Sequence, residues 1–150
     1  MSELRTTAQR KADVLAALER NSDAWLATAG RSGRPHLIAV SAWWDGDAMV
    51  FATTSGSLSA RNLDETRVAR LAVGSTEDAI MIDVEVLGGV PVAEADATLA
   101  QGFAAAVGWN PADEGPDWKF FRLRPLRMQA YRGYGELERR DVMRDGKWLA

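Results

Sequence analysis

The sequence predicts a mainly β protein in which an antiparallel barrel is accompanied by peripheral helices. About six short segments are apolar or alternate between apolar and polar residues, and turn residues separate them, as in hairpin-connected strands. These segments dominate the middle of the chain and do not alternate regularly with helices, which disfavours a parallel sheet. The chain has 150 residues and is 47% hydrophobic, which suits a single domain over residues 1–150 with a sizeable core.

The N-terminal segment, residues 1–22, is expected to carry one amphipathic helix over residues 6–20. Apolar residues recur there at the spacing of one helix face, and charged residues fill most other positions. The residues expected on the apolar side are Ala8, Ala12, Leu15 and Leu18.

Three strands are predicted next. Residues 24–30 form a short apolar strand, and the Gly and Pro of residues 31–35 indicate a turn. Residues 36–44 are apolar on both faces, so we expect this second strand to be buried on both. The DGD sequence at 45–47 is a strong hairpin signal, which predicts residues 48–54 as a third strand antiparallel to the second.

The second half contains two further helices and three strands. Ser57 is placed to cap a helix over residues 57–65, because a Ser side chain can accept from the free N–H groups of a first turn. Residues 68–74 return as a strand, and residues 78–90 alternate clearly between apolar and polar positions. Residues 94–109 have helical spacing that ends at Gly108.

A long final strand is predicted over residues 118–132. Its alternation slips at Pro125, which indicates either a bulge or an edge position. The C-terminal tail, residues 133–150, is polar and has no clear period, so we expect an ordered tail or an arm that reaches a partner.

Composition excludes several classes of function. The net charge of −3 argues against a nucleic-acid-binding protein, and no apolar run approaches the length of a membrane span. The N-terminus lacks the apolar centre of a signal peptide, so a cytoplasmic protein is expected. The absence of Cys excludes disulfides and thiolate catalysis.

Candidate acid–base groups are few. His36 is the only histidine and lies on a predicted buried strand, so neither a Ser-His-Asp triad nor a multi-histidine metal site is indicated. Asp83 and Glu85 share a strand face and could form a carboxylate pair, although a solvated strand face explains them more simply. An enzyme of this composition would therefore rely on a cofactor for its chemistry.

The run FATTSGSLSARNL, residues 51–63, combines hydroxyl groups, a predicted helix N-terminus and Arg61. Free backbone N–H groups, the helix dipole and a guanidinium together suit a phosphate group. The simpler interpretation of the same residues is a capped helix with Arg61 in solvent.

The order of elements, the run FATTSGSLSARNLDETRVARLAV (51–73) and the later RPLRMQAY (124–131) resemble the pyridoxamine 5′-phosphate oxidase-like family of flavin- or deazaflavin-binding split barrels. The resemblance covers residues 6–90 and extends more loosely to Arg132. It implies that the ring of a cofactor lies along the strand residues His36, Ile38, Ala39, Val40 and Ser41. It also implies that the ribityl and phosphate groups are held by Thr53, Thr54, Ser57, Ser59, Arg61 and Asn62.

One departure concerns the phosphate site. Many relatives carry a Lys where this chain has Ser59. Arg31 and Arg34, on the predicted turn, are candidates to replace its charge.

The resemblance further implies a homodimer with cofactor sites at the interface and an oxidoreductase that transfers hydride or electrons to a small organic substrate. Flavin mononucleotide (FMN) is the first choice of cofactor and the deazaflavin F420 the alternative. Trp109, Trp118 or Trp148 could cover the ring in a partner subunit, or each could simply pack in its own chain. A non-catalytic protein that binds or carries flavin, F420 or haem is the alternative function.

Overall fold

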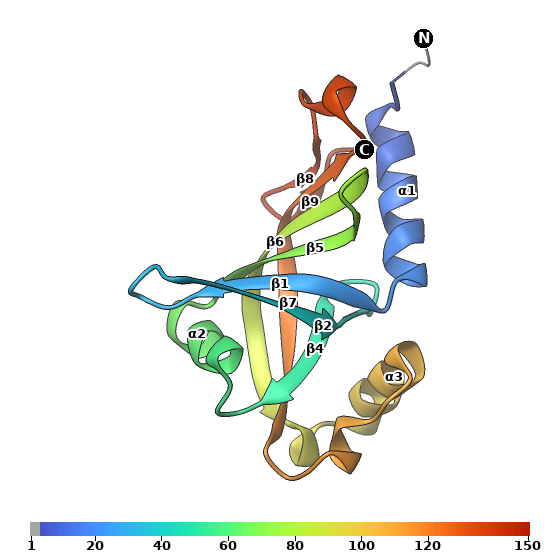
Figure 1. The fold of residues 1–150 in the computed structure, drawn as a ribbon. Helices are drawn as coiled ribbons and strands as arrows, with labels where there is room; N and C mark the ends of the chain where they lie inside the picture. Colours follow the sequence, from blue (N-terminus) through green and yellow to red (C-terminus); the bar gives the residue numbers. More distant parts are fainter. Residues whose placement is uncertain (1–3) are drawn as a thin grey trace.

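One curled antiparallel sheet organises the protein, in the computed structural model that describes residues 4–150 (Figure 1). Its strand order is β2-β1-β5-β6-β7-β4-β3, with a β8–β9 hairpin added to β7. The strands are β1 (Asp23–Ala29), β2 (Pro35–Ser41), β3 (Trp43–Trp44), β4 (Met49–Thr54), β5 (Val68–Ser75), β6 (Asp78–Pro91), β7 (Trp118–Tyr131), β8 (Asp141–Arg144) and β9 (Lys147–Trp148). The predicted mainly β, antiparallel split-barrel fold is confirmed.

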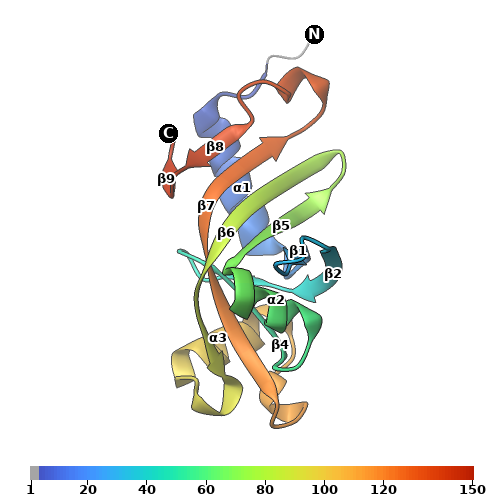
Figure 2. The ribbon, with the colours of Figure 1, turned by 90° about the vertical axis from the view of Figure 1, so that its left-hand side faces the viewer.

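Three α-helices lie around this sheet: α1 (Thr7–Arg20), α2 (Leu58–Thr66) and α3 (Ala97–Val107). Each begins at a residue whose side chain accepts a backbone N–H of the first turn, namely Thr6, Ser57 and Asp96. Figures 1 and 2 show α1 beside the β8–β9 end of the molecule and α3 at the opposite end. The predicted helices are therefore present, with bounds that differ by up to three residues.

The buried face of α1 differs from the prediction. Ala8 and Ala12 are exposed, and the buried residues are Arg10, Val14, Ala17 and Leu18. The guanidinium of Arg10 donates to the carbonyl of Arg139, so this buried polar side chain has a hydrogen-bond partner on the C-terminal segment. The prediction was right for Leu18 and wrong for Ala8 and Ala12, because the buried face also includes the polar residue Arg10.

The expectation that residues 36–44 form a strand buried on both faces was wrong. β2 is an edge strand that pairs only with β1 among the described strands, and Leu37 on its outer face is 62% exposed. The chain leaves the strand at Ala42, whose N–H donates to the carbonyl of Ser22. Only Trp43 and Trp44 then form the predicted hairpin with β4.

The irregularity predicted at Pro125 is a bulge within the sheet. Asp83 pairs with Arg127 and Val84 pairs with Pro125, so Leu126 has no partner on β6. β7 lies between β6 and β4 in the sheet, but its pairing with β4 ends at Leu123 and its pairing with β8 begins at Met128, so among the described strands Pro125 has a partner on β6 alone.

The C-terminal tail is more regular than its sequence indicates. It forms the β8–β9 hairpin, and its segment before β8 meets the N-terminus through Arg5, whose Nε donates to Oε2 of Glu136 at 2.9 Å. Among residues 4–150, no helix is both long enough and apolar enough to span a membrane.

Candidate functional site

The end of β4 and the residues that connect it to α2, Thr53 to Ser57 together, form a segment rich in hydroxyl groups, here called the hydroxyl loop. The Thr53 hydroxyl donates to Oγ of Ser57 at 2.9 Å, and the same Oγ accepts the N–H of Ala60 at 3.1 Å. Ser55 anchors the other side of the loop, because both its N–H and its hydroxyl donate to the carbonyl of Asp117. The predicted Ser57 cap is confirmed, and the loop is held at both ends.

The start of α2 offers an electropositive environment. The first helical hydrogen bond runs from the N–H of Arg61 to the carbonyl of Ser57, so the helix itself supplies no acceptor for the N–H groups of Leu58 and Ser59. The partial positive charge of the helix end is added to these donors. Arg61 is exposed and forms no ion pair with any carboxylate in residues 4–150.

Two of the predicted phosphate ligands face inward instead. Ser59 is 1% exposed, and its hydroxyl finds no hydrogen-bond partner within the part of the chain described. Asn62 is also buried, and its Nδ2 donates to Oγ1 of Thr28 on β1 at 3.1 Å. These residues dock α2 against β1, whereas Thr53, Thr54, Ser57 and Arg61 remain at the surface or partly exposed.

The five residues predicted to contact a cofactor ring are distributed over both faces of β2. His36, Ile38 and Val40 are half-buried, and the latter two pack against the main core. Ala39 lies on the outer, exposed face, and Ser41 accepts a hydrogen bond from Nε1 of Trp109 at 2.9 Å. The contiguous feature that they share is the backbone of an edge strand, which carries unpaired donors and acceptors.

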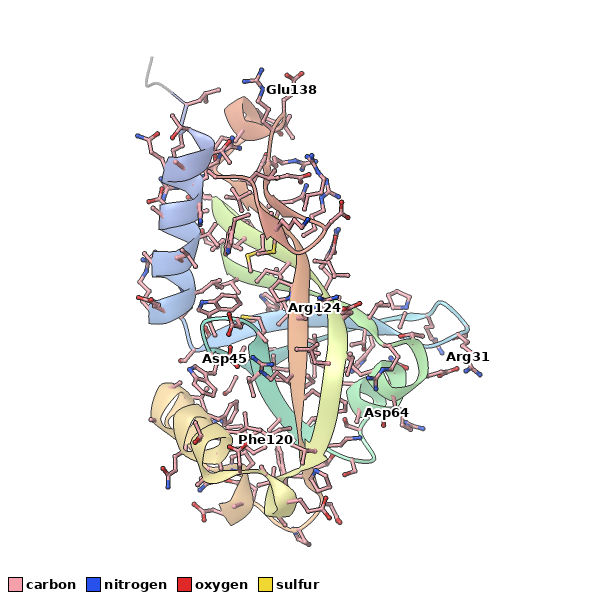
Figure 3. All side chains as sticks on the ribbon, turned by 180° about the vertical axis from the view of Figure 1, so that it is seen from behind. Arg31, Asp45, Asp64, Phe120, Arg124 and Glu138 are labelled. Carbon is pink, nitrogen blue, oxygen red and sulfur yellow. The ribbon has the colours of Figure 1, made fainter. Side chains whose placement is uncertain are left out.

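Thr28 connects the two predicted halves of the site. It is directly opposite His36 in the β1–β2 pair, and its hydroxyl accepts from Asn62 of α2. The β1–β2 turn also lies against the C-terminal half of α2, because Nε of Arg31 is 3.5 Å from Oε1 of Glu65. Figure 3 shows Arg31 at the tip of this turn, so it lies at the end of α2 opposite the hydroxyl loop.

One cation near the hydroxyl loop was missed by sequence reasoning. Lys119 of β7 is directly opposite Thr53 of β4, and its Nζ lies 3.2 Å from Oδ1 of Asp64 on α2. Figure 3 labels Asp64 on this side of α2. No spacing within the sequence signals Lys119, because its position depends on the register between two strands that are separated by more than sixty residues.

The tryptophans of the last third of the chain pack within it. Trp109 and Trp118 contact each other edge to face at 5.4 Å between ring centroids, and Trp109 also meets Phe103. Nζ of Lys11 lies 5.2 Å from the centroid of Trp148. Trp25 of β1, in contrast, is 52% exposed. The packing interpretation is therefore sufficient for Trp109, Trp118 and Trp148 in a single chain.

The residues whose pKa values are shifted lie away from the hydroxyl loop. Side-chain hydrogen bonding from Arg5 lowers the pKa of Glu136. Asp83 and Glu85 do not form a carboxylate pair, because each has its own arginine partner, Arg70 and Arg124 respectively. In the described range, no group of three His, Cys, Asp or Glu residues could hold a metal ion.

Comparison with known protein families gives a match that covers most of the chain. The family model for pyridoxamine 5′-phosphate oxidase matches residues 11–132. No curated protein matches the chain.

Several solved structures are similar in fold. An F420 reductase is 20% identical with a TM-score of 0.64, covering 75% of this chain and 93% of its own. General Stress Protein 26 from Bacillus anthracis is 17% identical with a TM-score of 0.64, covering 80% and 92%. The haem storage protein HutZ from Vibrio cholerae is 16% identical with a TM-score of 0.63, covering 91% and 98%. At these identities the similarity shows the fold alone.

Proposed function

This chain belongs to the pyridoxamine 5′-phosphate oxidase family, and we propose that it is an oxidoreductase that binds a flavin-type cofactor. The single observation that carries the proposal is the combination of the hydroxyl loop, the N–H groups of Leu58 and Ser59, for which α2 supplies no acceptor, and the guanidinium of Arg61, which pairs with no carboxylate in residues 4–150. Such a set of donors is suited to a phosphate monoester. FMN is the proposed cofactor and F420 the alternative.

The phosphate of FMN is the group that this donor set would hold. Hydroxyl and N–H donors with one guanidinium fit the phosphate of FMN. The buried Ser59 hydroxyl does not contribute in this arrangement, so the charge on the ligand is balanced mainly by Arg61 and the helix end. The proposed phosphate site would therefore depend more on hydrogen-bond donors than on positive charge.

The roles of the chain in the proposed reaction are binding and orientation. When bound, the flavin or deazaflavin ring supplies the hydride or electron transfer to a small organic substrate. The free backbone edge of β2 would orient that ring, and Ile38 and Val40 present apolar surface beside it. No protein acid or base is assigned a step, which is consistent with a single histidine in the chain.

We further propose that the protein acts as a homodimer. The outer face of β2, β1 and β5 carries exposed apolar side chains, of which Trp25, Leu37 and Val68 are each more than half exposed. Trp25 of β1 is opposite Ala39 of β2 and Ala72 of β5, so the outer face is continuous across the three strands. A second copy covering it would bury apolar area and place additional residues beside β2.

A second candidate function is non-catalytic storage or transport of flavin, F420 or haem. Ser59 favours this alternative, because its hydroxyl is buried without a partner in residues 4–150 and adds no positive charge for a phosphate. HutZ, a protein of similar fold, is a haem storage protein. Redox turnover separates the two functions: an enzyme passes electrons from its reduced cofactor to an acceptor, whereas a carrier only binds.

Substitution of Arg61 by Ala tests the phosphate assignment directly. Loss of a charge-assisted hydrogen bond should weaken FMN binding by roughly 1.5–3 kcal/mol. Riboflavin, which lacks the phosphate, should bind equally well to both proteins. Arg20→Ala, at the exposed end of α1, is the matched control. Unchanged FMN affinity in Arg61→Ala would remove Arg61 from the site.

A further inference from the structure

Lys119 lies beside the hydroxyl loop although it is distant from it in sequence. It is directly opposite Thr53 in the β4–β7 pair, and opposite residues of antiparallel strands project from the same face. The Thr53 hydroxyl donates to Ser57 at the start of α2, which identifies this face as the one on which the helix begins. Lys119 therefore brings an ammonium group to the same side of the sheet as the proposed phosphate site.

The path of the Lys119 side chain is determined by a close approach to Gly89 of β6. A Cβ at residue 89 would lie 2.4 Å from Cε of Lys119, so a larger residue there would displace the side chain. Nζ lies 4.9 Å from the centroid of the Phe121 ring. The side chain is 20% exposed, so most of it is packed against its neighbours.

Asp64 is the partner of this ammonium in the described structure. The distances from Nζ to Oδ1 and Oδ2 are 3.2 and 3.5 Å, and the Asp64 side chain is about half exposed. An ammonium has three N–H donors, and exposed ion pairs of this kind contribute little to stability. Lys119 is thus positioned by the fold, with donors that a stronger anion could engage.

We propose that Lys119 is a specificity-determining residue that favours phosphorylated cofactors, and that Asp64 competes with the phosphate for it. This inference rests on the proposed function. Under this proposal Lys119 of β7 supplies positive charge to the phosphate, which the uncharged Ser59 of α2 does not. Lys119 lies directly opposite Thr53 of the hydroxyl loop, whereas Arg31 lies on the β1–β2 turn and pairs with Glu65.

The test is titration of FMN and riboflavin into wild type, Lys119→Met and Asp64→Asn, followed by tryptophan fluorescence. Lys119→Met should bind FMN about tenfold more weakly and riboflavin within about twofold of wild type, because one charge-assisted contact is lost. Asp64→Asn should bind FMN more tightly than wild type, because the competing carboxylate is removed. Lys119→Arg keeps the charge and should retain the preference for FMN over riboflavin.

A purely structural role for the Lys119–Asp64 pair makes the opposite prediction. Both substitutions would then shift FMN and riboflavin affinity equally and in the same direction, and this result would overturn the proposal. If Lys119→Met does not fold, a loss of FMN affinity in Asp64→Asn would by itself overturn the proposal. If wild type binds FMN and Lys119→Met binds it with the same affinity, this inference alone is contradicted. Wild type that binds neither FMN nor F420 contradicts the proposed function itself.

Discussion

At the scale of single residues, Ser57 combines a structural and a proposed binding role. Its hydroxyl accepts from the N–H of Ala60 as a helix cap and from the Thr53 hydroxyl as part of the loop. These two contacts fix the direction in which α2 leaves β4. The same hydroxyl lies next to the free N–H groups that would face a phosphate, so its substitution can separate stability from binding.

We predict opposite outcomes for two substitutions of Ser57. Ser57→Asp keeps an oxygen acceptor at the cap, so its unfolding free energy should stay within about 0.5 kcal/mol of wild type, whereas Ser57→Ala should lose about 1 kcal/mol. The carboxylate of Ser57→Asp should repel the phosphate and abolish the preference for FMN over riboflavin. Urea unfolding and fluorescence titration measure the two effects. Retained FMN preference in Ser57→Asp would argue that no phosphate lies at this loop.

Part of this site could be predicted from sequence because its residues are close together in the chain. Thr53, Ser57 and Arg61 occur within nine residues, and the cap signal places them at a helix start. The burial of Ser59 and Asn62 could not be predicted, because it depends on how α2 rotates against β1. Lys119 could not be predicted either, since only the β4–β7 register brings it to Thr53.

At the scale of elements, the N-terminal helix and the C-terminal tail are joined by an ion-pair network. Arg5 donates to both Glu136 and Asp13, and the N–H of Arg132 also donates to Glu136. Glu136 is almost completely buried, so its charge depends on these partners. The network secures a tail whose own strands are short.

This network predicts a pH-dependent contribution to stability. Hydrogen bonding from Arg5 lowers the pKa of Glu136 in the folded protein, so the carboxylate stabilises the fold above its ordinary pKa, about 4.3. That contribution is lost as the pH falls below this value. Glu136→Gln should therefore cost about 2 kcal/mol at neutral pH and progressively less below about pH 4. A cost that is the same at pH 7 and pH 3.5 in urea unfolding would contradict the assignment.

The elements themselves were predicted with different success for physical reasons. Long segments with a clear period, such as β6 and α3, were identified, and the slip at Pro125 correctly indicated a bulge. β8 and β9 were missed because strands of four and two residues are too short to show alternation. The buried face of α1 was predicted only in part, because Arg10, whose guanidinium donates to a carbonyl of the tail, lies on it beside Leu18.

At the scale of the whole molecule, the sheet leaves β2 as an edge with an exposed apolar face. The sequence of β2 has apolar residues on both faces, and sequence reasoning therefore expected burial within one chain. The structure shows that the outer face of a single chain is uncovered there. A partner subunit would satisfy both observations, because it would bury residues that the chain cannot bury by itself.

The dimer proposal predicts the effect of a charge on this face. Leu37→Lys should convert a dimer to a monomer in sedimentation velocity, because an unpaired ammonium would have to be buried at the interface. The fold of the single chain should be unaffected, since Leu37 is exposed in it. Tyr134→Lys is the matched control, because Tyr134 is exposed on the C-terminal segment. Equal sedimentation of Leu37→Lys and wild type would place the interface elsewhere.

The central claim is that the start of α2 holds the phosphate of a flavin-type cofactor, and one measurement tests it most directly. Purified protein, stripped of ligand, is titrated separately with FMN, F420 and riboflavin while tryptophan fluorescence is recorded. The account predicts tight binding of FMN or F420 and binding of riboflavin that is at least tenfold weaker than that of FMN, since one charge-assisted hydrogen bond is worth about that factor. Equal affinities for FMN and riboflavin, or no binding of FMN and F420, would contradict it.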